Sequence, residues 1–249
     1  MKNTITLLIA AIAVFLPLAA SAGGGVLIGE TAQYRIYRYM FYAAHGLQTT
    51  AIVFSVAMLV PVWGGSSNFL LTMRGRTRDL IHSYPLMFIF VAVMSYLLGS
   101  TQGTLEAFRS LQQMWHLTNF TVGHSHLTMY GIIAFAIWGG IYGLLPMATG
   151  RRASALGMGL HFWMALVGCF IYVTSLSVGG TIQGLDWIRG LPFIQSVIDM
   201  QSYYVWRGVG GVLMFLSHVV FAWNVWRMCY AREAVPSPLG SLQGEGAVA

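Results

Sequence analysis

The stretch LTNFTVGHSHLTMYGIIAFAIWGGIYGLLP, residues 117–146, predicts a membrane-spanning helix that carries two histidines. It is apolar for long enough to cross a bilayer, which takes about 20 residues of helix. Ionisable side chains inside a membrane are costly, so His124 and His126 are candidates for a functional site. Because a helix turns about 100° per residue, positions two apart leave roughly opposite faces. The pair therefore suits two bulky cofactors on two sides of one helix, and not one shared ion.

The whole chain has the composition of an integral membrane protein. Of its 249 residues, 57% are hydrophobic and 8% are charged, which is unlike an ordinary soluble domain. No alternating strand pattern is present, so an all-α, polytopic transmembrane helix bundle is expected. The turn residues at 61–65 and 147–150 are expected to join helices. Five segments are long and apolar enough to span a membrane: 39–62, 82–101, 118–146, 156–180 and 203–228.

The two ends of the chain differ from this bundle. Residues 1–22 have one Lys, an apolar run and small residues before Gly23, so we expect a signal peptide or an N-terminal anchor helix. Residues 23–232 hold the five core helices. Residues 233–249 are rich in Pro, Gly and Ser and predict a disordered tail.

The basic residues predict an orientation. With Lys2 in the cytoplasm, eight of the thirteen Lys and Arg residues fall on the cytoplasmic side, in alternate loops. The net charge of +6 is scattered over short loops and forms no basic stripe, so no nucleic-acid partner is indicated. Cys169 and Cys229 lack the spacing of a disulfide framework or a zinc site.

The orientation places the histidine pair in the outer third of its helix, with His116 above it at the interface. Haem fits this order, because its iron takes an imidazole at membrane depth while its propionates need cations or donors nearer water. His45 lies at a similar depth and is either a second axial ligand or an interhelical donor. His161 is expected at the cytoplasmic interface, and His218 in a packed or hydrogen-bonded position within the last helix.

Several short motifs carry a resemblance to a known family. MWHLTNFTVGHSH, residues 114–126, is similar to the tenth helix of the catalytic subunit I of haem-copper oxidases, and among these of the cbb3-type cytochrome c oxidases and the related nitric oxide reductases. Further similar segments follow in the family's order and extend the resemblance over about residues 40–228: QT at 48–49, VFS at 53–55, PVWGG at 61–65, HFW at 161–163, QGL at 183–185 and YVWRGVGG at 204–211. Residues 23–232 therefore resemble the C-terminal half of that subunit.

The resemblance implies roles for four residues. His124 would be the proximal ligand of a high-spin haem b, where oxygen or nitric oxide reacts, and His126 an axial ligand of a low-spin haem b. His116 and Arg207 would contact haem propionates on the periplasmic side of a bacterial inner membrane. The electron donor implied is a c-type cytochrome.

The departures from the family pattern are as informative. Where a metal-binding His-His pair would precede the first matching helix, this chain has Arg35-Ile36-Tyr37-Arg38, and Gln102 stands where the family has an acid. The family's other ligands lie in helices that this sequence does not resemble. We therefore expect a second multi-helix membrane subunit to supply those helices and to bind copper or non-haem iron.

Two alternatives belong to other functional classes. The chain would be a non-catalytic haem b electron-transfer or quinol-handling subunit if His45 completed a bis-histidine site with the pair. It would be a cofactor-free transporter or assembly factor if the histidines were only structural, forming hydrogen bonds between helices.

Overall fold

The computed structural model describes the backbone of residues 30–230 and the side chains from residue 44 onward. The expectations for residues 1–22 and 233–249 lie outside these residues. The described elements, in order, are α2 (Glu30–Ala57), α3 (Leu59–Thr72), α4 (Thr77–His82), α5 (Tyr84–Glu106), α6 (Arg109–Trp115), α7 (Asn119–His126), the π-helix η1 (Leu127–Ala134), α8 (Phe135–Thr149), α9 (Ala155–Ile188), α10 (Phe193–Asp199) and α11 (Gln201–Tyr230). All are helical, which confirms the all-α prediction.

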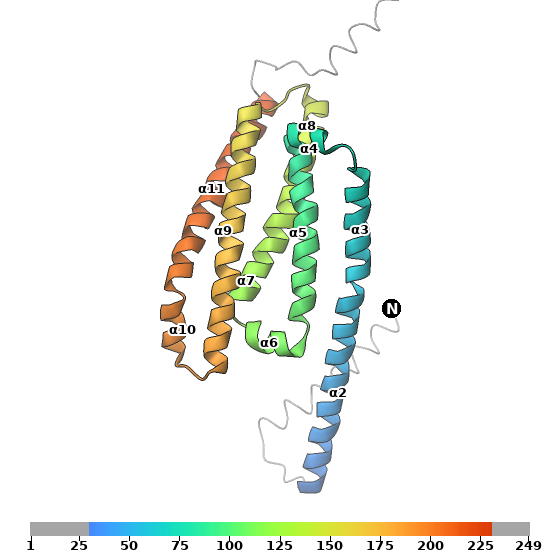
Figure 1. The fold of residues 1–249 in the computed structure, drawn as a ribbon, viewed down its shortest axis with the longest axis vertical. Helices are drawn as coiled ribbons and strands as arrows, with labels where there is room; N and C mark the ends of the chain where they lie inside the picture. Colours follow the sequence, from blue (N-terminus) through green and yellow to red (C-terminus); the bar gives the residue numbers. More distant parts are fainter. Residues whose placement is uncertain (1–29, 231–249) are drawn as a thin grey trace, which may run out of the picture. The chain divides into compact units, whose positions relative to one another are not determined.

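The chain divides into two compact units, residues 1–50 and residues 51–249. The described part of the first unit is the beginning of α2. The second unit contains the end of α2 and every later helix, and Figure 1 shows its long helices side by side. Within it, α5 packs against α3, η1 and α8, while α9 packs against α7 and α11.

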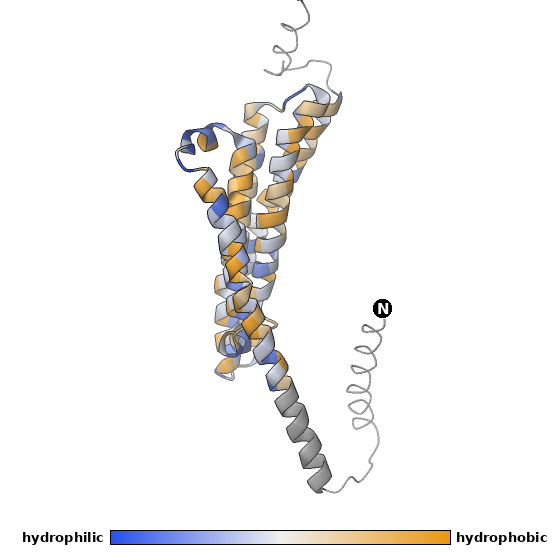
Figure 2. Cartoon of the chain, turned by 90° about the vertical axis from the view of Figure 1, so that its right-hand side faces the viewer, coloured by the Kyte–Doolittle hydropathy of each residue, from blue (hydrophilic) through white to orange (hydrophobic). Residues whose placement is uncertain are grey.

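Among the described residues five apolar spans are present, as the sequence predicted for this part of the chain: Ala44–Thr72, Tyr84–Glu106, Asn119–Thr149, Ala155–Ile188 and Gln201–Tyr230. Figure 2 shows hydrophobic residues along the helices and hydrophilic residues gathered toward their ends. Large apolar side chains face outward, as with Leu144 and Phe170, which are 68% and 70% exposed. A protein that presents such surfaces along helices of this length is a multi-pass membrane protein.

One expected turn is helical. Residues 61–65 were predicted to join two spans, but α3 runs through them from Leu59 to Thr72. Pro61 is the third residue of α3, where its missing N–H costs no intrahelical hydrogen bond, so the proline does not end the helix. The other expected joint is confirmed, because α8 ends at Thr149 and the residue that caps it, Gly150, has a left-handed φ of 68°.

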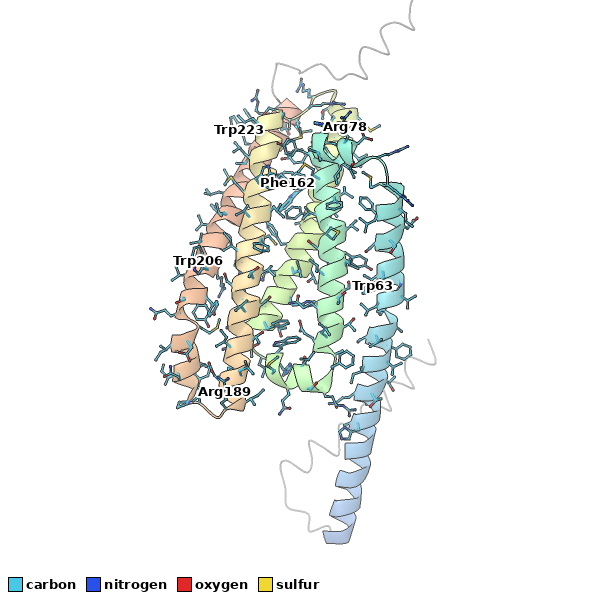
Figure 3. The ribbon with its side chains drawn as sticks, viewed as in Figure 1. Trp63, Arg78, Phe162, Arg189, Trp206 and Trp223 are labelled. Atoms are coloured by element: carbon cyan, nitrogen blue, oxygen red, sulfur yellow. The ribbon has the colours of Figure 1, made fainter. Side chains whose placement is uncertain are left out.

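The core of the second unit is aromatic. Phe88, Phe135 and Phe162 are almost fully buried, and the rings of Trp138 and Tyr142 pack around Phe88. Figure 3 shows Phe162 in the interior of this unit. The cluster joins α5, α8 and α9, so it sets the spacing of the helices on either side of the histidine-bearing segment.

His161 belongs to this core, and the prediction that it lies at the interface is wrong. Its side chain is 0% exposed, and the hydroxyl of Tyr142 lies 3.0 Å from its Nδ1. Asn224 Nδ2 donates to the same hydroxyl at 3.0 Å. The hydrogen bonds let α8, α9 and α11 bury polar groups that would otherwise be unsatisfied. His218 lies at an exposed position of α11, and its Nδ1 donates to Met214 O of the same helix at 2.6 Å, so the hydrogen-bonded alternative is the one confirmed.

Candidate functional site

The histidine pair lies on α7, which begins at a capped N-terminus. The Thr118 hydroxyl accepts a hydrogen bond from Phe120 N at 3.2 Å, and this satisfies one of the free amides of the first turn. Gln183 Oε1 of α9 accepts hydrogen bonds from Asn119 N and Asn119 Nδ2, at 3.0 and 2.9 Å. These contacts attach the start of α7 to α9.

Glycine lets α9 approach this segment closely. A Cβ on Gly180 would collide with the backbone of Phe120, and a Cβ on Gly184 would collide with Met114 O. Both glycines are buried in α9. Small residues at such positions allow backbone contact between membrane helices, so α9 fixes the height and rotation of the histidine pair.

His124 is directed at α5. Its Nδ1 lies 3.2 Å from Gln102 Oε1 and 3.6 Å from Glu106 Oε1, and the His124 and Glu106 side chains are only 21% and 13% exposed. The imidazole covers Gly103, where a Cβ would lie 3.1 Å from His124 Cε1 and 3.3 Å from Nε2. Two oxygen acceptors on α5 therefore lie next to the same ring nitrogen, His124 Nδ1.

His126 is directed at α9, on the other side of α7. Its ring centroid is 4.4 Å from that of Tyr172, and its Nδ1 donates to Val122 O of its own helix at 2.8 Å. The ring borders an open pocket of about 290 Å³ that Ser125, Met129 and Tyr130 also line. The contacts confirm that the two histidines serve opposite sides of one helix, and Figure 1 shows α7 between α5 and α9.

The hydrogen bonds determine which ring nitrogens are available. A backbone carbonyl is only an acceptor, so His126 Nδ1 carries the proton and Nε2 keeps its lone pair. The amide oxygen and the carboxylate beside His124 favour the same tautomer there. A histidine that ligates a metal commonly donates its other ring N–H to a carboxylate or a carbonyl. Both Nε2 atoms would thus keep the lone pair that a haem iron requires of its axial histidine.

Arg207 and His116 are the two further residues predicted to contact haem propionates, and of these, within the described residues, only Arg207 shares a contact residue with the histidine pair. Arg207 Nε donates to the Tyr172 hydroxyl at 3.1 Å, and its guanidinium lies 5.7 Å from the centroid of that ring. Arg207 and His126 therefore meet the same tyrosine. His116 is exposed at the end of α6, where Gln112 Nε2 donates to its Nδ1 at 2.8 Å. His45 belongs to the first unit, and its role stays a prediction.

A π-helical segment follows directly after His126. The π-helix η1 occupies Leu127–Ala134, between α7 and α8 of the same span. Such wide turns are rare and occur frequently at functional sites, because they change the direction of the side chains that follow. The irregularity marks the pocket side of the pair, where Met129 and Tyr130 lie within η1.

Two contacting residues escaped the sequence analysis. Glu106 was not among the predicted site residues, although it is four residues after Gln102 and shares its helix face, a spacing that was available as a signal. Tyr172 carries no local signal, because it reaches His126 and Arg207 only through the packing of α9 against α7 and α11.

The fold and the site together define a class. This is an all-α polytopic membrane protein in which one helix presents a histidine to each of two neighbouring helices. Residues 37–213 match the family described as Cytochrome C and Quinol oxidase polypeptide I. The chain belongs to this family.

Similar proteins come from bacterial oxidases. The chain is 30% identical over 224 residues to a cytochrome c oxidase subunit 1 homolog of Azorhizobium caulinodans, covering 83% of this chain and 41% of that relative. It is 31% identical over 196 residues to a cbb3-type cytochrome c oxidase subunit of Stutzerimonas stutzeri, covering 75% of this chain and 41% of that relative. The chain thus spans about 41% of the length of these relatives.

A solved structure of a heme-copper terminal oxidase dimer has a similar fold. The TM-score is 0.51 at 16% sequence identity, and the match covers 88% of this chain and 43% of the other chain. At this identity, the likeness describes the arrangement of helices.

Proposed function

We propose that the chain is the haem-binding part of the catalytic subunit of a membrane terminal oxidase, or of a nitric oxide reductase. The observation that carries the proposal is the pair on α7: His124 faces α5, His126 faces α9, and each has Nδ1 next to an acceptor. In a protein that only needed interhelical hydrogen bonds, His126 would be expected to bond across helices, yet its Nδ1 bonds to its own helix. Membership of the family supports haem as the ligand.

In this proposal His124 Nε2 would hold the high-spin haem b and His126 Nε2 the low-spin haem b. Bound haem would supply the one-electron chemistry, while the protein would hold and tune it. Gln102 and Glu106 keep the Nδ1 proton of His124 in place and so orient its ring. Tyr172 buttresses His126 and takes a hydrogen bond from Arg207, whose cation would compensate propionate charge.

The proposal includes a partner subunit that completes each haem site and binds copper or non-haem iron. Within the described residues, no group of three or more His, Cys, Asp or Glu side chains is arranged to hold a metal ion. The helix α3 buries only Val62 and Ser66, and the Ser66 hydroxyl has no hydrogen-bond partner in the structure. A helix so little covered offers a surface for a second multi-helix membrane subunit. A c-type cytochrome at the periplasmic face would deliver the electrons.

The test is the absorption spectrum of the complex purified from the native membrane. His124→Ala should remove the high-spin haem signal, and His126→Ala should remove the low-spin one. His218→Ala is the matched control, because His218 Nδ1 also donates to a carbonyl of its own helix, Met214 O at 2.6 Å. Unchanged spectra in both pair variants would refute the assignment. Metal analysis then decides the substrate: copper indicates an oxygen-reducing enzyme, and non-haem iron indicates a nitric oxide reductase.

A further inference from the structure

A groove lies between the first turns of α9 and the last turns of α11, away from the histidine pair. Its volume is about 440 Å³. It lies beside Trp223, which Figure 3 shows at the same end of the second unit as Arg78 and opposite Arg189. The arginines of the loops at this end predict that it faces the cytoplasm.

The groove is polar at its mouth. Ser154 caps α9 and accepts a hydrogen bond from Gly157 N at 3.0 Å, so the amides of Ala155 and Leu156 are left without intrahelical acceptors. Arg227 lines the same mouth from the last turn of α11, is exposed, and makes no hydrogen bond or ion pair to any described residue. An arginine and the start of a 34-residue helix both attract an anion.

The rest of the groove is apolar. Both helices change from polar residues at the mouth to apolar residues farther inside. The helix α9 begins at this end and α11 finishes here, so Leu160 and Val219 lie deeper in the bundle than Ser154 and Arg227. Leu160 is 48% exposed and Val219 is 53% exposed. Trp223 lies between the two levels, where tryptophan is enriched in membrane proteins.

We propose that this groove binds an anionic phospholipid. Its phosphodiester would lie at the mouth, next to the Arg227 guanidinium and the first amides of α9, and one acyl chain would lie along Leu160 and Val219. The order of a charged mouth, an aromatic ring and an apolar floor matches the order of headgroup, glycerol and acyl chain in a lipid. The site is independent of the haem assignment, because none of its lining residues contacts His124 or His126.

The test uses the full chain with its native partners, stripped of lipid in mild detergent and examined by native mass spectrometry. Dioleoyl-phosphatidylglycerol should bind, whereas dioleoyl-phosphatidylcholine and inorganic phosphate should bind much more weakly. Arg227→Gln should weaken phosphatidylglycerol binding about fivefold, which corresponds to about 1 kcal/mol per basic residue at an anionic surface. Arg227→Lys keeps the charge and should retain binding. Leu160→Trp fills the apolar floor and should weaken binding while leaving the mouth intact.

The control is Arg78→Gln, which removes the same charge at the same end of the bundle but outside the groove. It should bind phosphatidylglycerol like the unaltered protein. The proposal is overturned if Arg227→Gln and Arg78→Gln give equal affinities, if Leu160→Trp has no effect, or if inorganic phosphate binds as well as the lipid. Size-exclusion elution and the absorption spectrum confirm that each variant is folded, so a loss of lipid is separable from a failure of the haem proposal.

Discussion

Gly210 lies where the backbone of α11 closely approaches α9 beside Tyr172, and Gly210→Ala should separate the two helices. A Cβ there would lie 2.7 Å from Gly168 O and 2.8 Å from Tyr172 N. Ordinary van der Waals contact begins near 3.4 Å, so the backbones must move apart by about 0.7 Å. Overpacking of this kind lowers the free energy of unfolding by about 1–3 kcal/mol, whereas the higher helix propensity of alanine raises it by up to about 1 kcal/mol. We expect a net loss of about 1–2 kcal/mol in the free energy of unfolding.

The matched control is Gly208→Ala, two residues earlier on α11. A Cβ on Gly208 meets nothing within 4 Å, so only the gain in helix propensity remains, and the variant should be neutral or more stable by up to about 1 kcal/mol. Denaturation of both purified variants in detergent, followed by circular dichroism, measures the difference. Equal stability of the two variants, or a more stable Gly210→Ala variant, would show that the close crossing of α9 and α11 is not the constraint described above.

Two further substitutions test the surroundings of the histidine pair. On the proposed haem assignment, Glu106→Gln should lower the affinity for the haem on His124 by about ten- to a hundredfold, since the negative charge 3.6 Å from Nδ1 is lost, and leave the haem on His126 unaffected; haem titration followed by absorbance measures this. Tyr172→Phe removes the acceptor of the Arg207 hydrogen bond and should destabilise the site by about 0.5–1.5 kcal/mol. On the same assignment, the spectral change should be confined to the haem proposed for His126, and a change confined to the other haem would contradict the contact.

Much of the fold was predictable because a bilayer limits the choices. Long apolar segments must be helices when no water is available for the backbone, so the five spans were predictable from hydropathy alone. Residues 61–65 show where local signals fail. Pro and Gly favour turns, but a proline in the first turn of a helix breaks no hydrogen bond, and the longer apolar run prevails.

The candidate site was predictable to the extent that it depends on one helix. The spacing of His124 and His126 determines that they leave opposite faces, and their contacts with α5 and α9 confirm it. His161 shows the limit of such reasoning, because its position near a helix start indicated an interface. Its burial depends on Tyr142, which lies 19 residues earlier on a different helix, α8, and contacts His161 only because α8 and α9 pack together.

The sequence by itself determined the class of this protein, the five spans within its described residues and the opposed histidines, because hydropathy and helical periodicity are local properties. Only the tertiary structure decided what surrounds the pair: Gln102 and Glu106 beside His124, and Tyr172 with Arg207 beside His126. These neighbours come from other helices, and their contacts depend on how closely glycines let the backbones approach. The physical reason is that the acceptors beside His124 Nδ1 and the tyrosine ring beside His126 belong to helices distant in sequence, which packing alone brings within reach.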